Sequence, residues 1–133
     1  MSLVLDASAA VELVLARPRR SSIGAVIKQS DWVLAPSLFV YEVTNALWKY
    51  HRLAGVELTE LQLALEQAIA LANELIAADV LSAEALRISC EVACPAYDAA
   101  YLAAAKARGA ALLTLDLKLI ANARRVKVPI AQL

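Results

Sequence analysis

Short apolar runs alternate with longer amphipathic stretches along the whole chain. The short runs are rich in valine and leucine and are bounded by turn residues, which is typical of buried strands. The predicted strands lie at 3–5, 32–34, 80–81, 111–114 and 126–128. The longer stretches place apolar residues three and four positions apart, as the buried face of a helix does. The predicted helices lie at about 9–16, 21–29, 37–53, 59–77, 82–92, 95–109 and 117–123.

This alternation of strands and helices predicts an α/β fold. Parallel neighbouring strands need a crossover connection, and a helix in each connection covers the faces of the sheet. Gly55 and Gly109 stand just after two of the predicted helices and are expected to end them. The length of 133 residues, without a repeat or a linker, predicts one domain spanning 1–133.

Four acidic residues stand where this topology gathers side chains at one edge of the sheet. Asp6 and Asp116 come after predicted strands, and Glu42 and Asp98 lie in early turns of predicted helices. In an open parallel sheet, ligands bind outside the carboxyl ends of the strands. Each acid alone also has an ordinary interpretation, such as a helix cap or a partner of the helix dipole. Taken together, the four acids predict a carboxylate site.

Carboxylates gathered at one edge need a positive counter-charge. Two carboxylates about 5 Å apart repel by roughly 3 kcal/mol at an effective dielectric constant of about 20. Oxygen ligands with no histidine or cysteine nearby favour a hard divalent ion, Mg²⁺ or Mn²⁺. Such an ion activates water and stabilises the leaving oxygen in phosphodiester hydrolysis. The acids therefore predict a metal-dependent phosphodiesterase.

One face of the helix predicted at 37–53 adds positive charge next to this site. Glu42, Asn45, Lys49 and Arg52 are spaced three, four and three residues apart, which aligns them along the helix. The acid would reach the metal, and the two cations would follow the backbone of a nucleic acid substrate. A plain solvent-facing stripe remains an equally good interpretation of Lys49 and Arg52.

The charge balance and the cysteines restrict the remaining classes of function. Thirteen basic and thirteen acidic residues give a net charge of zero, which argues against a strongly basic duplex-binding surface. Cys90, Cys94 and the one histidine, His51, cannot complete a four-ligand zinc site, so buried thiols in a reducing compartment are expected. Acidic residues interrupt the apolar stretches, so no secretory signal or membrane span is expected, and the predicted location is cytoplasmic.

Four segments of the chain, taken in order, resemble the PIN-domain family and, within it, the VapC-type toxins of VapBC toxin–antitoxin modules. Each segment contains one of the four acids, and together they span almost the whole chain. The segments are 5–8 (LDAS), 41–47 (YEVTNAL), 97–103 (YDAAYLA) and 113–116 (LTLD). One aspartate after a strand is a weak signal, whereas four such motifs in order are a strong one.

The resemblance implies a three-layer sandwich around a five-stranded parallel sheet of order 3-2-1-4-5. It implies an endoribonuclease that depends on Mg²⁺ or Mn²⁺, with the catalytic and metal-binding role on Asp6, Glu42, Asp98 and Asp116. Supporting polar positions map onto Ser8, Asn45 and Thr114. It also implies a homodimer or higher oligomer, a cognate VapB-type antitoxin, and a structured RNA substrate such as tRNA or ribosomal RNA.

Two positions after the fourth acid depart from the family pattern. Many relatives carry another acidic or polar residue where this chain has Lys118, and an aromatic residue where it has Leu119. Lys118 would either weaken a second metal site or contact an RNA phosphate, which leaves the number of metal ions open.

Two other classes of function compete with the nuclease. A phosphotransfer enzyme of the haloacid dehalogenase type needs a second acid two residues after the first, where this chain has Ser8. A receiver domain needs a lysine after a later strand, an arrangement that Asp116 and Lys118 do not supply. A catalytically silent binding module of the same fold is the remaining alternative, although the intact set of acids argues against it.

Overall fold

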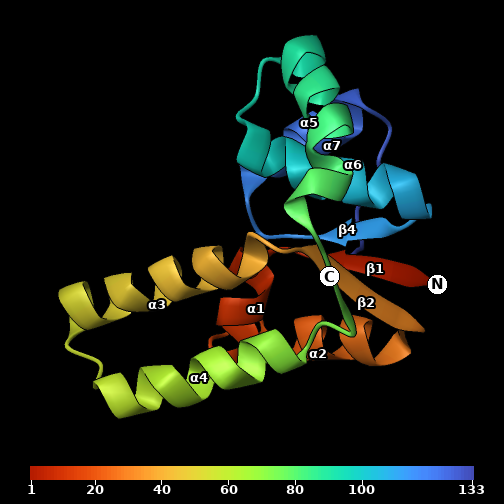
Figure 1. Ribbon diagram of the computed structural model, residues 1–133. Coiled ribbons are helices and arrows are strands. Elements are labelled where there is room, and N and C mark those ends of the chain that lie inside the picture. Colours follow the sequence, from red (N-terminus) through yellow and green to blue (C-terminus); the bar gives the residue numbers. More distant parts are fainter.

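Four parallel strands form the central sheet of the computed structural model, which describes residues 1–133 (Figure 1). The strands are β1 (Ser2–Leu5), β2 (Trp32–Pro36), β3 (Glu74–Ile76) and β4 (Ala111–Leu113). Their order in the sheet is β3-β2-β1-β4. The helices that connect and cover them are α1 (Ala7–Val14), α2 (Arg20–Gln29), α3 (Phe39–Ala54), α4 (Leu58–Ala70), α5 (Ala78–Val92), α6 (Ala96–Arg108) and α7 (Leu117–Arg125).

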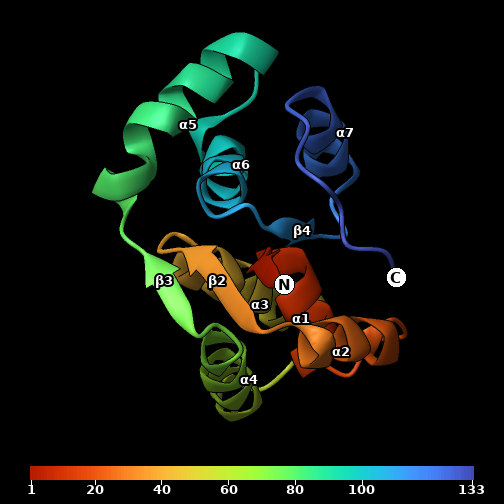
Figure 2. The ribbon, with the colours of Figure 1, turned by 90° about the vertical axis from the view of Figure 1, so that its right-hand side faces the viewer.

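Helices cover both faces of the sheet, and successive side chains of each strand point to opposite faces. Val4 and Leu34 belong to a core formed with α5, α6 and α7. Leu3, Leu5 and Val33 belong to a second core formed with α1, α2, α3 and α4. Figure 2 shows these two groups of helices on opposite faces of the sheet. The predicted three-layer α/β arrangement with a parallel sheet is therefore confirmed.

The strand predicted at 126–128 is wrong. The sheet has four strands, and not the five strands of order 3-2-1-4-5 that were predicted. Val126 and Val128 are apolar because both side chains are buried in the core beside α7, not because they form a strand. Lys127 between them has a left-handed φ of 62°, which an extended strand excludes. The chain beyond it touches the sheet only through a bridge between Leu112 and Ile130.

The segment between α4 and α5 also differs from the prediction. The helix expected to reach residue 77 ends at Ala70, and residues 74–76 form the edge strand β3. Asn73 sets this change of direction: its Oδ1 accepts the Val33 N–H at 2.8 Å, and its own N–H donates to the Val33 carbonyl at 2.7 Å. The predicted strand at 80–81 is wrong, because both residues lie in α5, which begins four residues before the expected start at 82.

Helices α3 and α4 form an antiparallel pair that extends away from the sheet (Figure 1). Gly55 ends α3 with a φ of 68° and Gly109 ends α6 with a φ of 58°, as predicted, because only glycine adopts this conformation without strain. Phe39, Val43 and Leu47 form the buried side of α3, which leaves its opposite side open to solvent.

The structure tests the prediction that both cysteines are buried thiols. Both cysteines are free; Cys94 is buried as predicted, whereas Cys90 is exposed, so that part of the prediction is wrong. None of the helices combines the length and the apolar character that crossing a lipid bilayer requires.

Candidate active site

Two of the four predicted acids lie side by side where β1 and β4 end. Leu5 pairs with Leu113 in the parallel register of these strands, and the Asp6 N–H donates to the Leu113 carbonyl at 3.0 Å. Asp6 begins α1 and Asp116 begins α7, each as the N-cap residue. The strand ends therefore bring together two carboxylates that are 110 residues apart in the sequence, since 116 minus 6 is 110.

Two hydroxyl groups hold the Asp6 carboxylate in place. Its Oδ2 accepts hydrogen bonds from Ser8 Oγ at 2.6 Å and from Thr114 Oγ1 at 2.7 Å. Each hydroxyl oxygen in turn accepts a backbone N–H, from Leu115 at 3.0 Å and from Asp116 at 3.0 Å. Because each hydroxyl donates its one proton to Asp6, the network orients that carboxylate and links the loop after β1 to the loop after β4.

Asp116 caps α7 and also lies at the cavity beside Asp6. One oxygen, Oδ1, caps α7 by accepting the N–H groups of Lys118 at 2.9 Å and Leu119 at 3.3 Å. The residue is exposed and also lines a cavity that Asp6 lines. The capping bonds fix the side chain through one oxygen and leave the other free of side-chain donors.

Glu42 reaches the site from α3 and is held by a tyrosine from the opposite helical layer. Tyr101 of α6 donates its hydroxyl proton to Glu42 Oε1 at 2.6 Å. The tyrosine is 1% exposed, and Glu42 is the one hydrogen-bond partner of its hydroxyl group. A buried tyrosine hydroxyl needs a partner, so this bond fixes the position of the Glu42 carboxylate. Sequence reasoning assigned no role to Tyr101, although a tyrosine three residues after Asp98 on one helix was a usable signal.

A cavity of about 260 Å³ joins three of the acids with two of the predicted supporting residues and one predicted RNA contact. Its lining residues are Asp6, Ala7, Ser8, Glu42, Asn45, Ala46, Lys49 and Asp116. Asp98 is half-buried in the first turn of α6 and is not part of this lining. Thr114 lies behind Asp6 and is 4% exposed.

The causes of the pKa shifts of Glu42 and Asp98 indicate that the four acids lie near one another. Burial raises the pKa of Glu42, the hydrogen bond from Tyr101 lowers it in part, and the charges of Asp6, Asp98 and Asp116 raise it further. Burial also raises the pKa of Asp98, followed by the charges of Asp116 and Asp6, while Lys118 lowers it. Burial raises the pKa of Asp6 against the opposing effect of its hydrogen bonds. Asp98 therefore belongs to the same cluster although it lies outside the cavity lining.

None of the four acids forms an ion pair within the protein. The cations that pair with acids elsewhere are on other surfaces, as with Arg108 and Glu74 or Arg87 and Glu84. No side-chain donor approaches the second oxygen of Asp6, Glu42 or Asp116, and Asp98 accepts no hydrogen bond. Lys118 and the hydroxyl groups of Ser8, Thr114 and Tyr101 offset this repulsion only in part, because the pKa values of Asp6, Glu42 and Asp98 remain raised. Such an environment is one that a bound cation stabilises.

The donor set fits a hard divalent ion. The side chains do not form a preformed cluster of three or more metal ligands. Mg²⁺ is usually held by one or two carboxylates, with water and substrate phosphate in its remaining positions, so an open set of carboxylate oxygens suits it. Asp6, Asp98 and Asp116 offer such oxygens at one edge of the sheet.

The predicted RNA-contact residues differ in how close they lie to the acids. Lys49 lines the cavity with Glu42 and Asn45. Lys118 follows Asp116 in the first turn of α7 and is close enough to lower the pKa of Asp98. Arg52 lies further along α3, with its guanidinium carbon 4.8 Å from the centre of the Trp48 ring.

A model of the PIN domain matches residues 3–125 of this chain. The chain belongs to the PIN-domain family. The match covers all four acids of this PIN domain and the strands and helices that position them.

Within this family, the chain is similar to VapC proteins. The domain is 34% identical over 122 residues to the ribonuclease VapC3 of Pyrobaculum aerophilum, covering 90% of this chain and 92% of the relative. The crystal structure of PAE2754 from the same organism matches with a TM-score of 0.73 at 30% identity, over 92% of this chain and 87% of the other. This PIN domain is therefore a homologue of a VapC ribonuclease.

A more distant structure shares the fold. The VapC20 toxin of Mycobacterium tuberculosis, described as cleaving the sarcin–ricin loop, matches with a TM-score of 0.63 at 16% identity. The match covers 90% of this chain and 93% of the toxin.

Proposed function

We propose that this PIN domain is a divalent-metal-dependent endoribonuclease whose active site contains Asp6, Glu42, Asp98 and Asp116. The main support is the convergence of four mutually repelling acids that have no ion-pair partner in the protein. The homology to a VapC ribonuclease supports RNA as the substrate.

Asp6, Asp98 and Asp116 would hold Mg²⁺ or Mn²⁺ through the oxygens that the protein leaves free. The chemistry such an ion supplies is polarisation of a phosphoryl oxygen and activation of water. Glu42 would contribute a further ligand oxygen or accept a proton from the attacking water. The second role is favoured by its raised pKa, which makes it a stronger base than an exposed glutamate. Ser8 and Thr114 keep Asp6 oriented through their hydroxyl groups.

Polar side chains on α3 would bind the substrate beside these acids. Lys49 lines the same cavity and would neutralise a phosphate of the RNA backbone, and Asn45 would donate to a phosphate or to water. Lys118 would contact a phosphate near Asp98.

The VapC relatives support further assignments in this proposal. The chain would act as the toxin of a toxin–antitoxin pair in the cytoplasm, with a VapB-type antitoxin as its inhibitor. It would form a homodimer and cleave a structured RNA such as tRNA or ribosomal RNA, as the VapC20 toxin is described to do at the sarcin–ricin loop.

A cleavage assay on total RNA tests this function. The purified chain is incubated with Mn²⁺ or Mg²⁺, with EDTA, and with EDTA followed by excess Mn²⁺. Defined cuts are expected with either metal, loss of cutting in EDTA, and recovery after Mn²⁺ is restored. Full activity in EDTA would overturn the metal mechanism. Absence of cutting under every condition would favour the silent binding module.

Metal should also stabilise the folded protein, and more so at neutral than at acidic pH. The raised pKa values of Asp6, Glu42 and Asp98 mean that the folded state binds protons more tightly than the unfolded state. Without metal, these acids therefore reduce stability as pH rises from about 4 through their raised values. Saturating Mn²⁺ at 100 times its Kd would add about 2.7 kcal/mol.

Thermal denaturation measures this effect as the difference in Tm with Mn²⁺ and with EDTA. The difference should be several degrees near pH 7.5 and should shrink near pH 5, since protons then compete with the metal. Asp6→Asn should raise Tm in EDTA and reduce the Mn²⁺ effect, whereas Glu66→Gln, an exposed acid of α4, should change neither. An equal Mn²⁺ effect in Asp6→Asn and the wild type would contradict the assignment.

A further inference from the structure

We propose that the exposed side of α3 binds an unpaired segment of the RNA substrate by stacking bases on its aromatic side chains, an inference that rests on the proposed function. The surface, named here the α3 track, consists of Tyr41, Asn45, Trp48, Lys49 and Arg52. All five side chains are exposed, Tyr41 at 80% and Trp48 at 51%.

Helical geometry places these residues along one strip beside the catalytic acid. Tyr41 and Trp48 are seven residues apart and so lie on the same side of α3, with Asn45 between them. At 1.5 Å per residue, Trp48 lies about 9 Å and Arg52 about 15 Å along the axis from Glu42. The track therefore begins at the active site and runs along the protruding helix.

The track is continuous with the carboxylate cavity. Lys49 and Asn45 line that cavity together with Asp6, Glu42 and Asp116. A strand whose scissile phosphate lies among the acids would thus extend directly over Lys49 and Trp48. The side chains of α3 beyond Glu42 include two cations and no acid, which favours a polyanion on this surface.

The chemistry of the track suits unpaired RNA better than a duplex. Aromatic side chains stack on the faces of bases, which are accessible only where the bases are unpaired. The Arg52 guanidinium lies over the Trp48 ring at 4.8 Å, so the indole and a cation are already arranged together. The zero net charge of the chain provides no general attraction for duplex phosphates.

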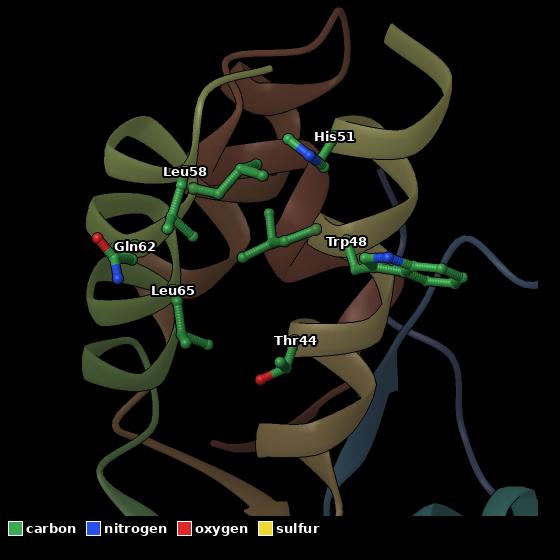
Figure 3. Close-up of a pocket in the computed structure, with 8 residues that line it drawn as sticks. Thr44, Trp48, His51, Leu58, Gln62 and Leu65 are labelled. Atoms are coloured by element: carbon green, nitrogen blue, oxygen red, sulfur yellow. The ribbon is translucent and has the colours of Figure 1, made fainter. Parts of the chain in front are cut away.

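A neighbouring apolar groove defines the main competing use of this helix. The groove has a volume of about 270 Å³ between α3 and α4 and is lined by Leu58, Leu61 and Leu65, with Trp48 at its margin. Figure 3 shows Leu58 and Leu65 directed toward α3, whereas the Trp48 ring points away from α4. Trp48 is one of the residues that line the groove, but its indole extends toward the α3 track.

Fluorescence anisotropy with a short labelled RNA tests the proposal. Asp98→Asn serves as the host protein in Mg²⁺ so that the RNA stays intact, and the same RNA annealed to its complement is the duplex probe. Trp48→Ala should weaken binding of the unpaired RNA about 10-fold, whereas Trp48→Phe should keep it within about 3-fold. Arg52→Gln should lower the slope of log Kd against log salt by about one.

Two variants serve as matched controls. Trp32→Ala removes an exposed indole at the amino end of β2, and Leu58→Ala alters the groove alone. Both should bind unpaired RNA as the host does. Equal binding by Trp48→Ala and the host, or equal losses for unpaired and duplex RNA, would overturn the proposal. A change of oligomeric state in Trp48→Ala, with RNA binding unchanged, would assign the surface to a protein interface and would also overturn it.

The cleavage assay separates this inference from the proposed function. Metal-dependent cutting by the wild type, with normal RNA binding by Trp48→Ala, would refute the α3 track alone. Selective loss of unpaired RNA in Trp48→Ala, in a chain that cuts no RNA, would support the track and refute the nuclease.

Discussion

Asp98→Asn is expected to lower metal-dependent cleavage of RNA by roughly 100-fold or more while the protein remains folded. Removing a residue that hydrogen-bonds to a metal ligand already lowers metal affinity or activity by about 10–100-fold, and Asp98 is proposed as a ligand itself. The side chain accepts no hydrogen bond and is half-buried, so the exchange removes a charge without breaking a contact. Stability should change by less than about 1 kcal/mol, because the lost interaction with the helix dipole opposes the relief of burial and of repulsion from Asp116 and Asp6, which raise the pKa of Asp98.

Asp79→Asn is the matched control for this variant. Asp79 lies in the first turn of α5 as Asp98 lies in the first turn of α6, and it is exposed. Both exchanges remove a favourable interaction with a helix dipole, worth about 0.3–1 kcal/mol, but only Asp98 faces the other acids. Initial cleavage rates at saturating Mn²⁺ and far-UV circular dichroism measure the two effects. Similar activity in both variants would show that Asp98 serves its helix and not the reaction.

Two substitutions of Tyr101 should separate packing from positioning. Tyr101→Ala empties a site in the core between α6 and the sheet and should reduce stability by about 3–5 kcal/mol. Tyr101→Phe keeps the ring and removes the hydroxyl that holds Glu42 Oε1 at 2.6 Å. The phenylalanine variant should lose only about 1 kcal/mol of stability. The cost of losing a buried charge-assisted hydrogen bond is partly offset because Glu42 can move toward solvent.

The phenylalanine variant should still lose about 10-fold in kcat with little change in KM for RNA, because the hydroxyl orients Glu42 and touches no substrate. Chemical denaturation gives the stabilities, and single-turnover cleavage gives the rates. A Tyr101→Phe enzyme with the wild-type kcat would mean that the tyrosine only fills the core. Phe39→Ala, which removes an aromatic ring from the other core, should lower stability similarly and leave kcat of the folded fraction unchanged.

The strongly apolar strands were predictable from the sequence, whereas the edge strand β3 and the course of the chain after α7 were not. The strands at 3–5, 32–34 and 111–113 are apolar because helices cover both faces. The edge strand β3 contains the charged Glu74, which bonds to Arg108 at the surface. Its three residues lack a strand's apolar pattern and were therefore predicted as the end of a helix. Val126 and Val128 alternate as strand residues do, but a left-handed Lys127 between them turns the chain.

The position of the acids was predictable from topology, and their surroundings were not. Residues that follow parallel strands meet at one edge whatever the details of packing, which brought Asp6 and Asp116 together. The bond from Tyr101 to Glu42 joins helices on opposite faces of the sheet, so it depends on tertiary distances that a single sequence does not contain. The exposed state of Cys90 is a similar case, because helix α5 turns that residue outward.

The hydroxyl network around Asp6 has a consequence for synthesis of the chain. The proton donor Thr114 and the backbone amides of Leu115 and Asp116 are translated more than one hundred residues after the carboxylate they support. A nascent polypeptide still tethered to the ribosome by this late segment has an Asp6 side chain without its orienting partners. The bond from Thr114 to Asp6 can form only after β4 has paired with β1, so a chain that stops before Thr114 would lack the oriented carboxylate of the proposed site.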